Sequence, residues 1–531
     1  MCGIAVAIDW PDAELTVQKL IQDIQHRGDV TDPITSLRKN TTMATRRLRI
    51  VDSERATQPQ LSYDGRIAVC LNGEIYNHAE LRRELCRLGA SFRTESDTEV
   101  LANALQHWGP QALERFVGMY AFVAIDIKSG EFLAARDPFG VKPLYAIQSG
   151  SSFVFCSEIR PLLKAIPAGD VLLVPPGYMV GSTGCGRYKS PVYPRSDLPV
   201  QHDPVKLDAL LSEAVRARLP IDLPVATSFS GGIDSTLITH YVRQYRPDAS
   251  GYFVGGANAP DYPFAAEYAD VTGLDLRVVK FEPDSEEVFG ALKHVIEVTE
   301  SFEPNLVRGA VCSLMAAEQM HRDGYRVALC GEGADELFCG YPPLELSFGG
   351  GGSDGHALRD ECLLLMSRVS LQRVDRCAMR YQVEMREPFL DPAVVKYALA
   401  LDPSALVQEI NGYPRGKAPL RDIYKLHSEL PQSISDRTKI PFGEGAGLDV
   451  TPQDSFWKHR FNEEISDREF FEGRIEFADF KIQSKEELFY IRCLTETMDI
   501  TRVPHLRDRA WISYSVNQNR EKLKAYSHFS L

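Results

Sequence analysis

The sequence has no pair of cysteines in a CxxC pattern, although it contains eleven cysteines at irregular spacing. Neither a cysteine zinc site nor a disulfide framework is therefore indicated, and most of these thiols are expected to be reduced and buried in a cytoplasmic protein. No window approaches the roughly 18 uninterrupted apolar residues that a membrane span requires. The short apolar run Ile4–Ile8 follows no basic region, so a secretory signal is not expected either.

The sequence also contains fewer basic than acidic residues. The chain carries 59 Lys and Arg against 73 Asp and Glu, a formal net charge of -14. Surfaces that bind nucleic acid need clustered Lys and Arg, so a nucleic-acid partner is not expected. A hydrophobic share of 44% and a charged share of 25% are ordinary for a folded protein. The length of 531 residues suggests about two to four domains.

The patterning of the sequence changes near residue 190. Before it, short strand-like runs are interrupted by a few helical segments. Four prolines between positions 191 and 204 mark the predicted linker. After it, strand-like and helical runs alternate, which predicts a parallel sheet with crossover helices, followed by a mainly helical region beyond Ser370. We therefore expect domains at 2–190 and 205–531, with a mobile glycine-rich loop at Phe348–Gly355.

Cys2 directly follows the initiator methionine. Removal of Met1 would leave a thiol and a free α-amine on one residue. An α-amine has a reference pKa of about 8, so it can accept the thiol proton and leave a thiolate that attacks a carboxamide. Alone, Cys2 is more often an ordinary second residue, so the segments around it decide the interpretation.

Three further segments fit a site for an amino-acid amide. The guanidinium of Arg47 suits a substrate carboxylate. Asn72 and the backbone N–H of Gly73 can form an oxyanion hole. Glu74 and Asp97 can bind an α-ammonium group. Each of these residues alone is more often a surface charge or a turn residue.

Together with NGEIYN at 72–77, SDTE at 96–99 and RDPFGVKPLY at 136–145, these residues resemble the class II glutamine amidotransferase domain. The resemblance covers about residues 2–190 and implies an α/β/β/α sandwich of the N-terminal nucleophile (Ntn) hydrolase type. It implies that Cys2 is the nucleophile. The residues implied to bind glutamine are Arg47, Ile50, Val51, Asn72, Gly73, Glu74 and Asp97. One departure is HRGD at 26–29, where the family usually has HRGPD, which leaves the shape of that loop open.

A second motif, SGGIDS at 230–235, lies between a strand-like run and a helix. Its glycines let the backbone approach phosphate oxygens, and its N–H groups and helix N-terminus favour an anion. Ser230 and Ser235 add hydroxyl donors, and Asp234 can hold phosphate-bound Mg2+. The motif lacks the Gly-Lys-Ser/Thr ending of a Walker loop. A strand–turn–helix without a ligand is the alternative.

This loop resembles that of ATP pyrophosphatases, which cleave ATP to AMP and pyrophosphate. FVG at 253–255, ESFEPNLVR at 300–308, GEGADELFCGY at 331–341, EMREPFLD at 384–391 and the segment 484–493 narrow the resemblance to the asparagine synthetase family. It spans nearly the whole chain. It implies a parallel-sheet α/β adenylating domain after the sandwich, with ATP, Mg2+, glutamine and a carboxylic acid as ligands, and a homodimer.

The resemblance also implies roles for residues of the second domain. Those expected to bind ATP and pyrophosphate are Ser230, Gly231, Gly232, Ile233, Asp234, Ser235, Val254, Cys330, Gly331, Arg308 and Lys439. Lys439 belongs to a predicted closing loop at 437–443. Asp234 and Asp335 are the expected Mg2+ ligands. Glu332 is the candidate general base that deprotonates ammonium, and a structural capping carboxylate is its alternative.

The implied reaction activates a carboxylate, because AMP leaves far more readily than oxide. Ammonia freed by Cys2 would travel through an apolar passage that keeps it neutral and out of bulk water. One rival is an intramolecular amide former similar to the β-lactam synthetases, which have lost the N-terminal cysteine and carry Tyr at the position of Glu332. The other rival is a non-catalytic glutamine-binding scaffold. Intact Cys2 and Glu332 argue against the first rival, and together with SGGIDS they argue against the second.

Aspartate is the acceptor that the resemblance implies. Four places depart from the usual synthetase pattern: Cys330, Cys339, Arg380-Tyr381-Gln382 and Glu387. Some of them are predicted to lie near the acceptor site. They leave open a different carboxylic acid, in specialised metabolism, as the acceptor.

Overall fold

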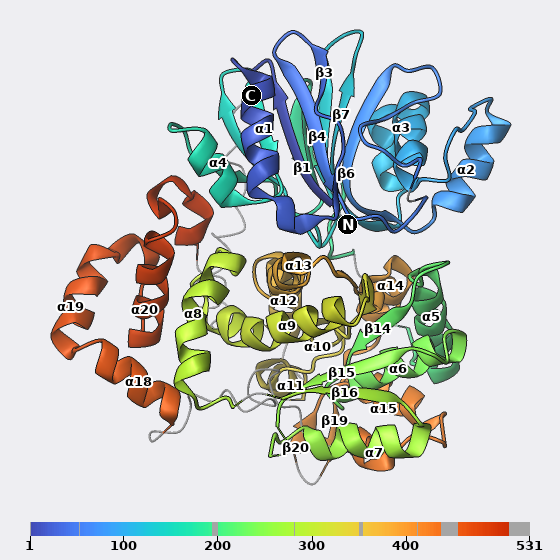
Figure 1. Ribbon diagram of the computed structural model, residues 1–531. Coiled ribbons are helices and arrows are strands. Elements are labelled where there is room, and N and C mark those ends of the chain that lie inside the picture. The colour runs from blue at the N-terminus through green and yellow to red at the C-terminus, as the bar shows by residue number, and fades with distance from the viewer. Residues whose placement is uncertain are drawn as a thin grey trace.

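The computed structural model describes residues 2–52, 54–193, 200–256, 258–280, 282–349, 354–410, 413–436 and 455–508. Its two parts are stacked, with the N-terminal part above the C-terminal part in Figure 1. Lys439 and the loop predicted around it lie outside the described residues, as does part of the predicted linker. None of the helices in these ranges is long and apolar enough to cross a membrane.

The N-terminal part contains two antiparallel sheets with helices on their outer faces. The strands of the first sheet are β1 (Cys2–Ile8), β2 (Val30–Thr31), β3 (Thr35–Arg38), β4 (Thr41–Arg47), β9 (Tyr145–Ser149), β10 (Ser152–Cys156) and β11 (Leu172–Leu173). The strands of the second are β5 (Gln60–Leu61), β6 (Ile67–Ile75), β7 (Gly118–Asp126), β8 (Phe132–Arg136), β12 (Tyr178–Gly181) and β13 (Gly184–Arg187). The helices are α1 (Ala13–Asp23), α2 (His78–Arg87), α3 (Asp97–Trp108) and α4 (Ile159–Ala165).

These elements form the predicted α/β/β/α sandwich. The sheet orders are β11-β9-β10-β1-β4-β2, with β3 beside β4, and β13-β12-β8-β7-β6-β5. Helices α1 and α4 cover the first sheet, and α3 covers the second with α2 beside it. Side chains alternate between the two faces of a strand. The large side chains of β1, such as Ile4 and Val6, therefore fill the space between the sheets, while Ala5 and Ala7 let the α1 side pack closely.

The C-terminal part is built on one parallel sheet. Its strands are β14 (Val225–Ser228), β15 (Ser250–Val254), β16 (Asp275–Val279), β17 (Val327–Leu329) and β18 (Glu384–Arg386), and β19 (Gln408–Ile410) and β20 (Tyr413–Arg415) form a separate hairpin. Its helices are α5 (Pro204–Ala217), α6 (Ile233–Tyr245), α7 (Tyr262–Thr272), α8 (Glu286–Thr299), α9 (Pro304–Arg322), α10 (Ala334–Leu337), α11 (Pro342–Gly349), α12 (Asp354–Leu365), α13 (Ser370–Arg380), α14 (Pro392–Ala400), α15 (Ala418–Lys425), α16 (Gln432–Asp436), α18 (Phe456–Glu464), α19 (Asp467–Glu476) and α20 (Lys485–Thr495).

The sheet order β16-β15-β14-β17-β18, with every neighbouring pair parallel, confirms the predicted α/β class. Strand β18 and the β19–β20 hairpin were not predicted, because three-residue strands are too short to show alternation. The predicted bounds of the mobile loop, Phe348–Gly355, are wrong at both ends, because α11 extends to Gly349 and α12 begins at Asp354.

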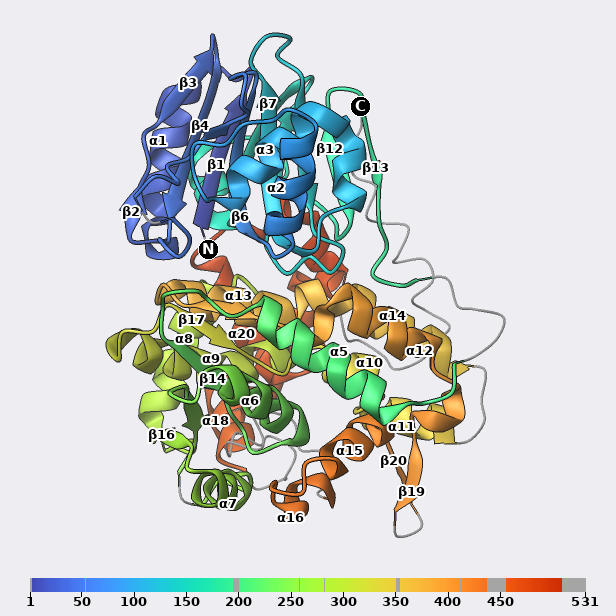
Figure 2. The same ribbon diagram turned by 90° about the vertical axis from the view of Figure 1, so that its right-hand side faces the viewer.

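Buried ion pairs join the two parts. Helix α13 lies directly beneath the sandwich in both views (Figure 1, Figure 2). Its Arg376 contacts Glu158 of the sandwich at 3.2 Å and Glu300 at 2.8 Å. Its Asp375 contacts Arg27 of the sandwich at 2.9 Å. These five side chains are all buried. Removing one member would leave a buried charge without its partner, which is more costly than losing a surface pair.

We predict that Arg376→Met lowers the free energy of the first unfolding transition by about 3–5 kcal/mol, the cost of breaking a buried ion pair. Urea unfolding followed by circular dichroism measures it. Arg380→Met, at the exposed end of the same helix, is the matched control and should change stability little. Equal stability of the two variants would contradict the importance of the interface cluster.

Candidate active sites

The first candidate site surrounds Cys2 at the start of β1, at the end of the sandwich that faces the C-terminal part. The Cys2 backbone N–H donates to Asn72 Oδ1 at 3.1 Å. This contact fixes the orientation of the Asn72 amide. Its Nδ2 is buried and has no hydrogen-bond partner among the described residues. A buried donor without a partner is costly unless a ligand accepts from it, so Asn72 Nδ2 fits an oxyanion hole.

Gly73 adopts a φ of 143° on β6. A Cβ atom at this position would lie 2.0 Å from the backbone oxygen of Met119. Only glycine permits that approach between β6 and β7, so the backbone beside Asn72 depends on Gly73. The segment NGE was predicted from its side-chain chemistry, and the structure adds this steric reason.

The predicted carboxylate-binding residue, Arg47, lies opposite Cys2 in the β1–β4 register. Its Nε donates to Asp32 Oδ2 at 2.9 Å, and Asp32 also accepts the Gln58 backbone N–H at 2.9 Å. Asp32 therefore orients the guanidinium. Asp32 was missed by the sequence analysis, because nothing in its neighbourhood marks it.

The HRGD loop, whose shape the sequence left open, packs against both parts. Asp29 contacts Arg49 at 2.9 Å and Arg326 of the C-terminal part at 3.3 Å. Arg326 also donates to the Arg49 carbonyl at 3.1 Å. The segment that carries Ile50 and Val51 follows immediately, and both residues are half-buried. Their predicted role in glutamine binding stays a prediction.

Glu74 and Asp97, the predicted ammonium-binding pair, are both buried. Asp97 accepts the Ile75 backbone N–H at 2.8 Å. Glu74 contacts Arg386 of β18 at 3.4 Å. Burial raises the pKa of both carboxyls, and the nearby Glu384 adds to the effect at Glu74. A bound ammonium would offset that cost of ionisation. Arg386 was not predicted and makes this site continuous with the C-terminal sheet.

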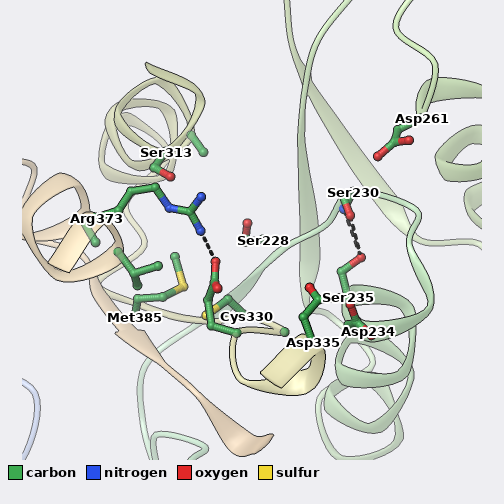
Figure 3. Close-up of a pocket in the computed structure, with 15 residues that line it drawn as sticks. Ser228, Ser230, Asp234, Ser235, Asp261, Ser313, Cys330, Asp335, Arg373 and Met385 are labelled. Carbon is green, nitrogen blue, oxygen red and sulfur yellow. Dashed lines mark hydrogen bonds and ion pairs between the residues drawn. The ribbon is translucent and has the colours of Figure 1, made fainter. Parts of the chain in front are cut away.

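The second candidate site begins at the SGGIDS loop between β14 and α6. Ser235 Oγ accepts a hydrogen bond from the Ser230 backbone N–H at 3.1 Å. The hydroxyl oxygens of Ser230 and Ser235 also lie 3.1 Å apart, and Figure 3 shows the contact between these two residues. Gly231, at φ 70°, packs so closely on α7 that a Cβ would lie 2.7 Å from Ala265 N. The two hydroxyls and two glycines close a tight turn at a helix N-terminus, which fits phosphate.

The position of the loop in the sheet supports that interpretation. Strand β14 pairs with β15 on one side and with β17 on the other, so the strand order reverses here. Ligands of open parallel sheets bind at such a point, outside the carboxyl ends of the strands. Gly331 follows β17 at this edge, where a Cβ would lie 2.9 Å from Asp234 Cβ. The structure thus brings the predicted residues 230–235, Cys330 and Gly331 together.

Lys417 joins the two predicted Mg2+ ligands. Its Nζ lies 2.5 Å from Asp234 Oδ2 and 2.5 Å from Asp335 Oδ1. The two carboxylate oxygens are therefore no more than about 5 Å apart. Two carboxylates beside a phosphate loop are a suitable donor set for Mg2+, which takes oxygen ligands at about 2.1 Å and binds substrate phosphates. Lys417 was missed, because a lone lysine far along the chain carries no motif.

A pocket opens beside these residues. It is lined by Ser228, Ser230, Asp234, Ser235, Asp261, Ser313, Ala316, Cys330, Gly331, Glu332, Asp335, Arg373, Val374, Ala378 and Met385. Glu332, the predicted base, forms an ion pair with Arg373 of α13 in this pocket (Figure 3). Arg373 was not predicted either. It fixes Glu332 between the loop and the apolar side chains of α13.

Two predicted nucleotide residues lie elsewhere. Arg308 contacts Glu486 of α20 at 3.2 Å, and the described lining of the pocket does not include it. Val254 ends β15 with its side chain buried and is likewise outside that lining. Their roles at ATP stay predictions.

Comparison with known proteins identifies a family for each part of the chain. The glutamine amidotransferase domain family matches residues 1–171, and the asparagine synthase family matches residues 206–348 and 353–498. The chain belongs to the asparagine synthetase family.

Curated relatives cover most of this chain. A probable asparagine synthetase [glutamine-hydrolyzing] of Schizosaccharomyces pombe is 30% identical over 93% of both chains. Asparagine synthetase [glutamine-hydrolyzing] 2 of Oryza sativa subsp. japonica is 28% identical over 92% of this chain and 84% of its own. Among solved structures, a glutamine phosphoribosylpyrophosphate amidotransferase from B. subtilis complexed with ADP and GMP has a TM-score of 0.31 and 18% identity, covering 52% of this chain and 65% of its own. Family membership confirms the predicted enzyme class, a ligase that forms amides with glutamine and ATP.

The departures from the asparagine synthetase pattern fall in different places. Cys330 lines the pocket, whereas Cys339 and the segment from Arg380 to Gln382 are absent from its described lining. Glu387 is also absent from it, but it is buried, and its Oε1 has no hydrogen-bond partner among the described residues. Burial raises the pKa of Glu387 to about 8, and the nearby charges of Lys142 and Arg218 oppose this. Lys142 belongs to the sandwich, so Glu387 faces the junction of the two parts.

The raised pKa of Glu387 predicts a pH dependence of stability. The folded protein favours the neutral carboxyl, whereas the unfolded chain ionises at its ordinary pKa, so stability is lost as pH rises from about 5 through 8. We predict that Glu387→Gln raises the melting temperature by several degrees at pH 8.5 and by little at pH 5.

Thermal unfolding of both proteins at the two pH values measures this difference. Glu476→Gln, at an exposed position of α19, is the control and should give no pH-dependent gain. A Glu387→Gln protein whose advantage is the same at both pH values would show that Glu387 stays ionised in the folded state.

Proposed function

We propose that this chain converts aspartate to asparagine, activating the aspartate side chain with ATP and using ammonia released from glutamine. The observation that carries the proposal is the buried Asn72 amide nitrogen beside Cys2, which lacks a partner among the described residues. A buried donor in this place is costly unless an acceptor, such as the oxyanion of a tetrahedral intermediate, forms there.

In the glutaminase site, Cys2 is proposed as the nucleophile. Burial raises the pKa of its thiol to about 11. At neutral pH only about one thiol in ten thousand would then be ionised, so attack requires a base in the site. Loss of Met1 would supply one, the α-amine of Cys2 itself. Asn72 Nδ2 and the Gly73 N–H would stabilise the tetrahedral oxyanion.

Glutamine would be bound by charged side chains that neighbouring ion pairs hold in place. Arg47, oriented by Asp32, would bind the α-carboxylate. Glu74 and Asp97 would bind the α-ammonium, and Arg386 would keep Glu74 in place from the far side of the domain junction. Water would then hydrolyse the γ-glutamyl thioester.

In the synthetase site, residues 230–235 would hold the phosphates of ATP. Asp234 and Asp335 would hold Mg2+, which when bound neutralises charge on the phosphate oxygens. Lys417, already 2.5 Å from both carboxylates, would add positive charge where pyrophosphate leaves. Glu332, fixed by Arg373, is proposed as the base that removes a proton from the attacking nitrogen.

Aspartate is proposed as the acceptor on the names of the curated relatives. We further propose a cytoplasmic location and a homodimer. None of the eleven cysteines forms a disulfide in the structure and most are buried, which suits a reducing compartment.

We predict that Cys2→Ala abolishes asparagine formation from glutamine but leaves most of the rate with added ammonium, because only the glutaminase site loses a reacting atom. Lys417→Met is the complementary variant. It should lower pyrophosphate release by at least about 100-fold, as expected when one charge-stabilising group is lost, with either nitrogen source. Glutamine hydrolysis by Lys417→Met should remain.

Coupled assays of glutamate, pyrophosphate and amide separate these activities. A Cys2→Ala protein that loses the ammonium-dependent reaction, while keeping wild-type stability, would contradict two separate sites.

The acceptor is tested separately with a panel of carboxylic acids, scored by pyrophosphate release and by mass spectrometry of the amide. We expect aspartate to be turned over with a KM in the micromolar to millimolar range that is usual for enzymes. A different acid that is clearly preferred over aspartate would overturn the assignment and favour a specialised pathway.

A further inference from the structure

A cluster of potential metal ligands lies in the C-terminal part, where α5, α6 and the end of α15 pack together (Figure 1, Figure 2). His240 comes from α6, and His427 and Glu429 come from the segment after α15. One ligand atom of each side chain lies within 4.8 Å of the others. The proposed amidotransferase reaction uses none of the three.

The hydrogen bonds of the two rings show where their lone pairs point. His427 Nε2 lies 2.7 Å from Asp208 Oδ1, which also accepts the Tyr241 hydroxyl at 2.6 Å. A carboxylate only accepts, so His427 Nε2 carries the hydrogen. In a neutral ring the lone pair is then on Nδ1, which faces Glu429 Oε1 at 3.8 Å.

In the second ring Nε2 has the opposite role. His240 Nε2 lies 3.0 Å from the side-chain amide nitrogen of Gln244. An amide nitrogen donates, so His240 Nε2 is the acceptor and carries a lone pair. It lies 3.7 Å from Glu429 Oε1. The lone pairs of both rings therefore lie near the Glu429 carboxylate. A cation would take the place of the Gln244 hydrogen on His240 Nε2, because the exposed Gln244 side chain can turn away.

The distances suit a small tetrahedral ion. Metal–nitrogen and metal–oxygen bonds of about 2.0–2.1 Å place tetrahedral ligand atoms about 3.4 Å apart. The observed 3.7 and 3.8 Å between the histidines and Glu429 would need to shorten by a few tenths of an ångström, and the two imidazole ligand atoms, which lie within 4.8 Å of each other, would also need to approach. The Glu429 side chain is exposed and can move toward the two rings, whereas the His240 ring is buried and held in place. The Asp208–His427 contact is the carboxylate–histidine pair that orients many metal-bound rings.

We propose that His240, His427 and Glu429 bind a divalent transition metal of the Zn2+ type, with Asp208 orienting His427 and with one coordination position left for water. Imidazole ligands favour such metals over Mg2+. The site joins α6 and α15, which both begin at the nucleotide pocket, where Lys417 at the start of α15 contacts Asp234 of α6. His240 lies about 9 Å along α6 from Asp234, at 1.5 Å per residue.

Co2+ binding to metal-free protein tests the proposal, because the absorption spectrum distinguishes nitrogen and oxygen ligands from cysteine thiolates. We expect one equivalent of Co2+ to bind with tetrahedral d–d bands and no thiolate charge-transfer band, and Zn2+ to displace it. Zn2+ should also raise the melting temperature. His427→Gln and Glu429→Gln should abolish this binding. Asp208→Asn should weaken it about 10- to 100-fold, as expected for an orienting carboxylate.

The matched control is His294→Gln, which removes the histidine of another His–Glu pair, with Glu297 at 3.9 Å on α8. It should leave Co2+ binding unchanged. Glu429 is exposed, so its variant is expected to fold even where a histidine variant does not. Three results would each overturn the proposal. They are a failure of Co2+ to bind the wild-type protein, binding with thiolate bands only, and binding that survives both Glu429→Gln and His427→Gln.

Discussion

The buried ion pairs between the sandwich and helix α13 are the constraint on which the rest of the molecule depends. Arg27 donates to the Cys2 carbonyl at 3.2 Å and also pairs with Asp375 of α13. Two residues earlier on the same helix, Arg373 holds Glu332 in the nucleotide pocket. One helix therefore connects the backbone of the proposed nucleophile with the proposed base of the second site. Displacing one of these charges within the closed interface would leave its partner buried and unpaired, so the ion pairs hold the two sites in a fixed relation.

A second connection runs through β18. Arg386 contacts Glu74 of the glutamine site at 3.4 Å, and its own strand neighbour Glu384 accepts from it at 2.6 Å. The sheet that presents the phosphate loop thus also carries the partner of a glutamine-binding candidate. The next residue, Glu387, places a buried carboxyl at the same junction. Substitutions in this segment should influence both reactions, which distinguishes it from residues that serve a single site.

Local sequence patterns predicted the parallel sheet and the phosphate loop, because each depends on alternation, glycine positions or a short motif, whereas the sandwich was implied by the family resemblance. Asp32, Arg373, Lys417 and Arg386 were missed for a common physical reason. Each acts through a partner distant along the chain, as Lys417 does with Asp234, 183 residues away. Motif resemblance also named Arg308, yet its guanidinium pairs with Glu486 of α20, a contact that no local pattern reveals.

The most direct test of two coupled sites is to supply glutamine labelled with 15N in its amide together with unlabelled ammonium, and to measure the label in the amide product by mass spectrometry. If ammonia passes from the Cys2 site to the nucleotide pocket without leaving the protein, most of the product carries 15N even when ammonium is in excess. Product whose label simply follows the composition of the solution would contradict the account.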